Sequence, residues 1–271
     1  MLTFVPTPIG NPQDITIRAL RVFEEATLFL CEDTRETKRL LRLLAERFMF
    51  SYPSDEVEFL SFHEHNGEER LREVASRLKS ESVVYVSDAG MPVISDPGQL
   101  LVAYAQAEGI DYDVLAGASA VTTAYAASGF EEGQFSFYGF LPSKGALRSE
   151  ALHEVLNAQF NTVLYEAPHR IEKLIEEIAS LDPNRELFCA KELTKRFQHY
   201  FRGSANEVKA HLASSSAKGE WVVIVRAKER TPSLYLEDIL SLDLAPKVKA
   251  KLLSKITDKS TKAWYNELIA K

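Results

Sequence analysis

A short, largely apolar run at Val83 to Val86 constrains the fold of this chain more than any other segment. A strand that is apolar in both side-chain directions is buried on both faces, which is typical of the centre of a parallel sheet. The segment that follows, 87–98, contains the pattern Ser-Asp-x-Gly twice. Gly90 permits a tight turn and lets its amide approach a ligand. We expect Asp96 to cap the next helix, and Asp88, which has no helix to cap, to contribute to a ligand site.

Strand-like and helix-like segments alternate along most of the chain, which predicts an α/β protein with two α/β domains and a mostly parallel first sheet. We expect strands at 2–5, 27–31, 57–62, 83–86 and 112–115, with helices starting near 16, 34, 97 and 120 and a further helix over 67–78. A second unit is expected near 135, with strands at 135–140, 162–166, 187–192 and 221–225 and helices at 148–157, 170–180 and 206–213. The predicted domains are 1–117, 118–230 and a small helical domain at 231–271 that begins with a linker at Thr231–Ser233.

Charge is distributed unevenly along the chain. The net charge is −7, yet the segment from Ala245 onward contains seven lysines and only two acidic residues. Such a basic segment is either a solvated helix face or a contact for nucleic acid, and charge alone does not decide between them. No apolar run approaches the ~18 residues of a membrane span, and no leader precedes the first strand, so we expect a cytoplasmic protein. Cys31 and Cys189 lie in apolar runs and are expected to be buried thiols.

Polar or glycine residues follow nearly every expected strand, and the ends of parallel strands collect ligand sites. These strand ends are 6–11, 32–35, 63–66, 87–90, 116–119, 166–170 and 191–195. The phosphate loop, the dinucleotide fingerprint and the serine-hydrolase elbow are all missing from the sequence. His63, Glu64 and His65 could suggest a metal site, but Glu64 would point to the opposite face of a strand from the two histidines, and no further cluster at ligand spacing supports such a site, so we expect no metal. Pro6 and Pro8 lack amide donors and suit a neutral or cationic ligand better than phosphate.

Ten ordered blocks of this chain resemble one family. They are Val5–Asn11, Asp14–Thr16, Glu32–Arg35, Ser87–Gly90, Ile94–Gly98, Gly117–Ala120, Gly139–Pro142, Tyr165–Arg170, Glu192–Lys195 and Lys218–Glu220. They look like the bacterial ribosomal RNA small-subunit methyltransferase I family of the tetrapyrrole methylase superfamily. The resemblance covers Leu2 to about Arg226, and the basic tail is similar to the family's small C-terminal helical domain.

The resemblance implies an S-adenosylmethionine-dependent enzyme that methylates the ribose 2′-hydroxyl of a cytidine in the decoding region of 16S ribosomal RNA. It also implies that the enzyme forms a homodimer and needs no metal. Matching blocks assign the cofactor pocket to Pro8, Ile9, Asp88, Gly90, Met91, Ile94, Ser119, Ala120 and Tyr165.

Methyl transfer to a ribose hydroxyl benefits from a carboxylate that takes the proton. We expect Asp33 or Glu166 to do so, with assistance from Lys191. The residues expected to contact RNA are Arg35, His65, Asn66, Arg170 and Lys195. The alternatives are a helix cap for Asp33 and a surface position for Arg170. Two other functions also remain open, a corrin or porphyrin methyltransferase and a ribosome assembly factor without catalytic activity.

Overall fold

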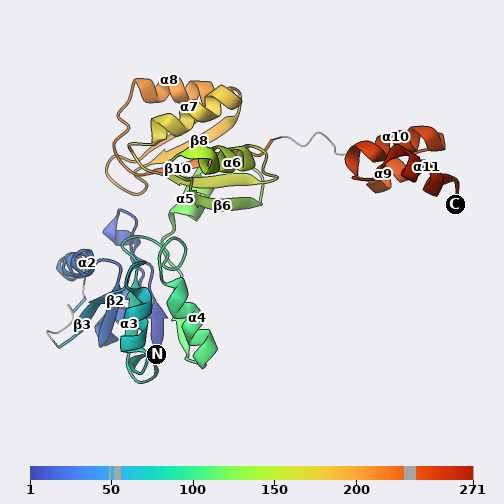
Figure 1. The fold of residues 1–271 in the computed structure, drawn as a ribbon. Coiled ribbons are helices and arrows are strands. Elements are labelled where there is room, and N and C mark those ends of the chain that lie inside the picture. The colour runs from blue at the N-terminus through green and yellow to red at the C-terminus, as the bar shows by residue number, and fades with distance from the viewer. Residues whose placement is uncertain (49, 52–55, 229–235, 271) are drawn as a thin grey trace. The chain divides into compact units, whose positions relative to one another are not determined.

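The first five strands form one parallel sheet in the order β3-β2-β4-β1-β5 (Figure 1). Their bounds are Leu2–Phe4 for β1, Leu28–Cys31 for β2, Glu58–Ser61 for β3, Val83–Val86 for β4 and Tyr112–Val114 for β5. The predicted central strand is confirmed, because β4 lies between β2 and β1 and all four of its residues are buried. The computed structural model describes residues 1–48, 50–51, 56–228 and 236–270.

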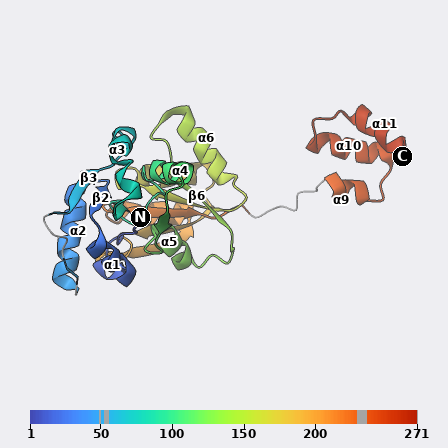
Figure 2. The same cartoon turned by 90° about the horizontal axis from the view of Figure 1, so that it is seen from below.

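Alternating side chains of β4 enter two different cores. Val84 and Val86 pack in the core with α1 (Ile17–Glu25) and α2 (Thr34–Arg47). Val83 and Tyr85 pack in the core with α3 (Gly67–Val74) and α4 (Gln99–Glu108). Figure 2 shows α1 and α3 separated by the strands. The apolar composition of β4 therefore reflects helices on both faces of the sheet.

Two helix predictions need correction. The helix expected over 67–78 ends at Val74, and a separate 3-10 turn covers Arg77–Lys79. The helix expected to start after Asp96 begins at Gln99 with Gly98 as its cap residue. Asp96 instead orders the loop, because its carboxylate accepts hydrogen bonds from the amides of Gly98 at 2.9 Å and Val93 at 2.7 Å.

The second sheet is mixed and has the order β6-β7-β10-β8-β9, in which only β6 and β7 are parallel. Its strands are β6 (Phe135–Phe140), β7 (Asn161–Glu166), β8 (Glu186–Lys191), β9 (His199–Ser204) and β10 (Trp221–Val225). Strand β9 was not predicted. The residues of this edge strand are exposed or half-buried, and the strand lacks the apolar run that marks the other strands in the sequence.

Helices cover both faces of the second sheet. One core contains α6 (Gly145–Leu156), α7 (Ile171–Leu181) and α8 (Ala205–Ala213), and Figure 1 shows α7 beside α8. The opposite core contains α5 (Ala120–Ser128) together with Ile9 from the first half of the chain. Cys31 and Cys189 are both buried free thiols, as predicted.

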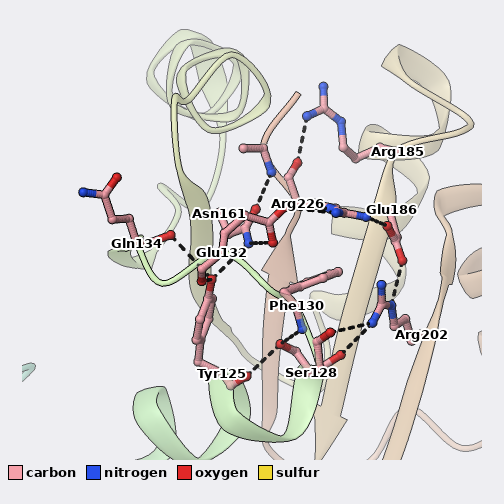
Figure 3. A network of polar contacts seen from close by, with 12 residues as sticks. Tyr125, Ser128, Phe130, Glu132, Gln134, Asn161, Arg185, Glu186, Arg202 and Arg226 are labelled. Atoms are coloured by element: carbon pink, nitrogen blue, oxygen red, sulfur yellow. Dashed lines mark hydrogen bonds and ion pairs between the residues drawn. The ribbon is translucent and has the colours of Figure 1, made fainter. Parts of the chain in front are cut away.

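A polar network closes one end of the second sheet (Figure 3). Buried Asn161 donates to the Tyr125 hydroxyl and to Glu132, each at 3.1 Å, and accepts from the Ala227 amide at 2.7 Å. Arg226 bonds Glu132 and Glu186, and its guanidinium lies over the ring of Phe130. This network fixes the backbone at the end of β10.

The chain folds into two compact units, Met1–Ala227 and Lys228–Lys271. The second unit contains α9 (Leu236–Ser241), α10 (Pro246–Ile256) and α11 (Thr261–Ile269), which confirms the predicted helices. They enclose a small core of Ile239, Ala250, Leu253 and Trp264. The domain boundaries near 117 and 230 stay predictions, and the linker predicted at Thr231–Ser233 lies outside the described residues. No helix within the described ranges is long and apolar enough to cross a membrane.

Candidate functional site

A pocket of about 480 Å³ lies where the strand-end loops of the first sheet meet β6, β7 and β10. This volume is in the range of small-molecule sites. Eight of the nine predicted cofactor residues line it, and Pro8 is the exception; the eight are Ile9, Asp88, Gly90, Met91, Ile94, Ser119, Ala120 and Tyr165. The fold therefore brings together residues that were selected at separate strand ends, while their contact with a cofactor stays a prediction.

The turn at Gly90 forms one wall of the pocket. Its φ of +81° is a conformation that side-chain-bearing residues rarely adopt, and a Cβ there would lie 3.1 Å from Ile9 Cγ2. The tight turn is confirmed, but the expected free amide is not. The Gly90 amide donates to the Thr7 carbonyl at 3.0 Å, and the Thr7 amide donates back to the Gly90 carbonyl at 3.0 Å.

Glu32 lines the pocket although it was not among the predicted site residues, whereas its neighbour Asp33 is not a lining residue. Asp33 caps α2 by accepting from the Arg35 amide at 2.8 Å, and its other oxygen pairs with Arg35 Nη2 at 2.6 Å. These bonds hold the pKa of Asp33 well below its usual range. Burial raises the pKa of Glu32, and the nearby charges of Asp88 and Asp96 add to this effect.

Glu166 lies at the edge of the pocket, but its side chain is fully buried between two arginines. Arg170 Nε is 3.0 Å from Glu166 Oε1, and Arg148 Nη1 is 3.8 Å from Oε2. Both arginines also donate to backbone carbonyls of the 139–142 block, Arg170 to Leu141 at 2.6 Å and Arg148 to Pro142 at 3.0 Å. This arrangement suits a carboxylate that holds two pocket loops together.

The predicted lysines are also committed to partners. Lys191 donates to the Ser216 carbonyl at 2.6 Å and lies 5.5 Å from the centre of the Trp221 ring. Lys195 bridges Glu192 at 3.0 Å and Glu220 at 2.9 Å. Neither lysine lines the pocket.

The remaining predicted RNA contacts lie outside the pocket. Arg35 has a side chain that is 87% exposed, and His65 is exposed as well. Asn66 organises its own loop, since it accepts from the His63 amide at 2.8 Å and donates to the Ser61 carbonyl at 3.1 Å. Arg35 and His65 are therefore the members of the predicted set that are open to a macromolecular partner.

The pocket is acidic. Five carboxylate residues line it, and its described wall contains no lysine, arginine or histidine; the five are Glu32, Asp88, Asp96, Glu166 and Glu220. Glu166 and Glu220 are paired with cations that do not line the pocket, so the negative charge of the wall comes mainly from Glu32, Asp88 and Asp96. The buried Ser87 hydroxyl is on the same wall and has no hydrogen-bond partner among the described residues. Glu220 and Trp221 were not predicted, because they lie at the start of β10. This antiparallel strand reaches the pocket with its opposite end, and no local signal reveals that pairing.

Comparison with known proteins identifies the family to which this chain is related. The sequence profile of the Tetrapyrrole (Corrin/Porphyrin) Methylases matches residues 1–209. A protein of Helicobacter pylori strain J99 named ribosomal RNA small subunit methyltransferase I is 44% identical over 277 residues, with 98% of this chain and 96% of the relative covered. A protein of the same name from Thermotoga maritima is 42% identical and covers 84% of this chain and 99% of the relative. This chain belongs to the ribosomal RNA small subunit methyltransferase I family.

Solved structures support the fold of this methyltransferase I family member at low sequence identity. Cobalt precorrin-4 methyltransferase has a TM-score of 0.58 and 17% identity, with 82% of this chain and 93% of that chain covered. Uroporphyrin-III C-methyl transferase from Thermus thermophilus, complexed with S-adenyl homocysteine, has a TM-score of 0.54 and 16% identity, with 82% and 96% covered. The resemblance and the α/β fold class derived from the sequence are thus confirmed.

The raised pKa of Glu32 predicts a pH-dependent effect on stability. The folded state holds this proton more tightly than the unfolded state, so ionisation of Glu32 opposes folding once the pH exceeds the usual value of about 4.3. Glu32→Gln should therefore raise the thermal midpoint near neutral pH, and its advantage over wild type should vanish as the pH falls to about 4.

Thermal unfolding monitored by circular dichroism at several pH values measures this difference. Glu64→Gln, at an exposed position in the nearby 63–66 loop, is the matched control and should leave the neutral midpoint unchanged. A Glu32→Gln advantage that is equal at both ends of the pH range would contradict the assignment.

Proposed function

We propose that the pocket binds S-adenosylmethionine, and the observation that carries this proposal is its acidic lining without a basic residue on the described wall. A sulfonium cation is stabilised beside carboxylates, whereas a triphosphate is repelled by them. The unpartnered Ser87 hydroxyl offers an additional polar contact, and the turn at Gly90 brings backbone close to the pocket without a side chain. Bound S-adenosylmethionine would supply an electrophilic methyl group. Ile9, Ser119, Ala120 and Tyr165 would hold the remainder of the molecule.

The proposed substrate is ribosomal RNA of the small subunit, and the proposed acceptor is the ribose 2′-hydroxyl of a cytidine in the decoding region. Relatives with 42–44% identity over most of the chain carry the name ribosomal RNA small subunit methyltransferase I, which supports the RNA substrate. The cytidine and the 2′-oxygen rest on the resemblance of the sequence blocks. The tetrapyrrole enzymes are only 15–18% identical and support the fold alone.

The chain's own groups would position the acceptor and remove its proton. Positioning contributes on the order of 7–11 kcal/mol where reacting groups are held in line. Asp33 and Glu166 were predicted as proton acceptors, yet the first is bound by Arg35 and the second by Arg148 and Arg170. Glu32 faces the pocket and has a raised pKa, so we assign to Glu32 the role of accepting the proton of the ribose hydroxyl. Asp33, Glu166 and Lys191 then act as positioning residues.

Further properties belong to the same proposal. The enzyme works as a cytoplasmic homodimer and needs no metal. The described residues contain no group of three or more His, Cys, Asp or Glu side chains arranged to hold a metal ion. We also propose domain boundaries near 117 and 230. The pocket then lies between the first two domains, both of which belong to the first compact unit.

The function is tested by incubating unmethylated small ribosomal subunits with the full chain and radiolabelled S-adenosylmethionine, with uroporphyrinogen III as the alternative acceptor. We expect label in 16S RNA, in a nucleotide whose 3′ phosphodiester resists alkali because its 2′-oxygen is blocked. Activity should persist with EDTA. Label in the tetrapyrrole only would favour the corrin or porphyrin function, and no cofactor binding by calorimetry would favour an assembly factor.

The assignment of Glu32 predicts a separation of binding from rate. Glu32→Gln should lower the methylation rate at saturating substrates by about 10²- to 10⁴-fold, the usual contribution of a general base. Asp33→Asn is the matched neighbour and should have a smaller effect on this rate. Calorimetry with S-adenosylmethionine checks that both variants still bind the cofactor. Equal rates for Glu32→Gln and wild type would return the role to Asp33 or Glu166.

The C-terminal unit is proposed to contact RNA phosphates. Lys247, Lys251 and Lys255 are exposed and spaced four residues apart on α10, so they share one face. Replacing all three by Gln should weaken RNA binding and reduce the slope of log K against log salt by about 0.7–0.9 for each lost contact. The control replaces Lys144, Lys173 and Lys209, which carry the same charge in the first unit. Equal slopes for the two triple variants would exclude this role.

A further inference from the structure

Where β6 pairs with β7, the six residues Phe135–Phe140 lie opposite the five residues Asn161–Tyr165. Phe137 pairs with Val163, and Gly139 pairs with the next residue, Leu164, so Tyr138 is extra. Gly139 has a φ of +80°, and the nearest atom to a Cβ built there is 3.9 Å away. Glycine is therefore required by the backbone conformation rather than by lack of space. The arrangement is a β-bulge, and bulges commonly redirect a side chain next to a functional site.

The bulge decides which face of the sheet Phe140 occupies. After the extra residue Phe140 pairs with Tyr165, and therefore shares the face of Tyr165 and Val163. That face packs against α5 and Ile9, whereas the alternate residue Leu164 packs against α6–α8. In a regular strand Phe140 would instead pair with Glu166, and the two-residue alternation would turn its ring to the face covered by α6–α8.

Phe140 lies at the opening of the pocket. It is a lining residue and yet 54% exposed, and its ring centre is 5.6 Å from that of Tyr165 at an interplanar angle of 62°. Ile94, another lining residue, is 51% exposed. The part of the Phe140 ring that is exposed to solvent contributes no hydrophobic stabilisation to the folded chain. A bulge that nevertheless directs this ring to the opening of the pocket favours a role in contacting a ligand.

Charge selects the part of an RNA that can reach this ring. The carboxylates of the wall repel phosphates, so the phosphates must stay outside, while the uncharged base and ribose can approach. Every base has a π-face that stacks on an aromatic side chain. We propose that Phe140 is the stacking platform for the base of the nucleotide that receives the methyl group, an inference that rests on the proposed function.

The test compares Phe140→Ala, Phe140→Leu and Phe140→Trp in methylation of unmethylated small ribosomal subunits by the full chain. Loss of one base stack corresponds to about 5- to 150-fold, and we expect this decrease in kcat/KM for Phe140→Ala. Phe140→Leu should be similarly impaired, whereas Phe140→Trp should retain activity. Phe160→Ala, which removes another exposed aromatic at the opposite end of β7, is the control and should match wild type.

Calorimetry with S-adenosylmethionine and the thermal midpoint are measured for every variant. Unchanged cofactor affinity and midpoint for Phe140→Ala support the platform. Full activity of Phe140→Ala or Phe140→Leu overturns it, as does a loss of cofactor affinity as large as the loss of activity, because the ring would then serve the cofactor. If wild type does not methylate the subunits, the proposed function itself fails and the platform fails with it; an active wild type with an unaffected Phe140→Ala rejects the platform alone.

Discussion

Two hydrogen bonds between the ends of β2 and β4 determine the acidic wall of the pocket. Asp88 accepts from the Asp33 amide at 3.1 Å, and its own amide donates to Glu32 Oε2 at 3.3 Å. The strands are parallel and in register up to Cys31 and Val86, so the residues after them meet. Asp88 also lies at the start of α2, where the helix dipole favours a negative charge. Burial nevertheless raises the pKa values of Glu32 and Asp88, so bringing these carboxylates together opposes folding and favours a cation between them.

The cations near the pocket are held by other acids, which leaves Glu32 and Asp88 facing the pocket. Arg35 pairs with Asp33, and Arg170 pairs with Glu166. A site for phosphates would direct such side chains inward. Here they stabilise the loops from outside, so the same residues that give the site its geometry keep positive charge off its wall.

The first sheet and its strand ends could be predicted well from the sequence, because in a parallel sheet all carboxyl ends meet at one edge. The second sheet was harder, since antiparallel β10 brings Glu220 and Trp221 to the pocket from its starting end. The direction of individual side chains was even harder to predict than the pairing of the strands. Glu32 and Asp33 are adjacent, and one lines the pocket while the other caps a helix, a difference that no pattern in a single sequence resolves. The bulge at Tyr138 could not be predicted from the sequence either, because it appears only once the pairing with β7 is known.

The loop 192–195 shows how the two halves of the first unit share one site. Glu192 and Thr194 have positive φ values of 51° and 61°, a conformation that costs of order 1–3 kcal/mol for each such residue. Opposing contacts hold it: the Asn11 amide donates to Thr194 Oγ1 at 3.0 Å, and the Thr194 amide donates to Gln198 at 2.6 Å. A Cβ on Gly10 would lie 2.8 Å from the Leu193 carbonyl, so only glycine permits this approach. Since Leu193 lines the pocket, this strained segment joins the first strand-end loop to the wall of the second sheet.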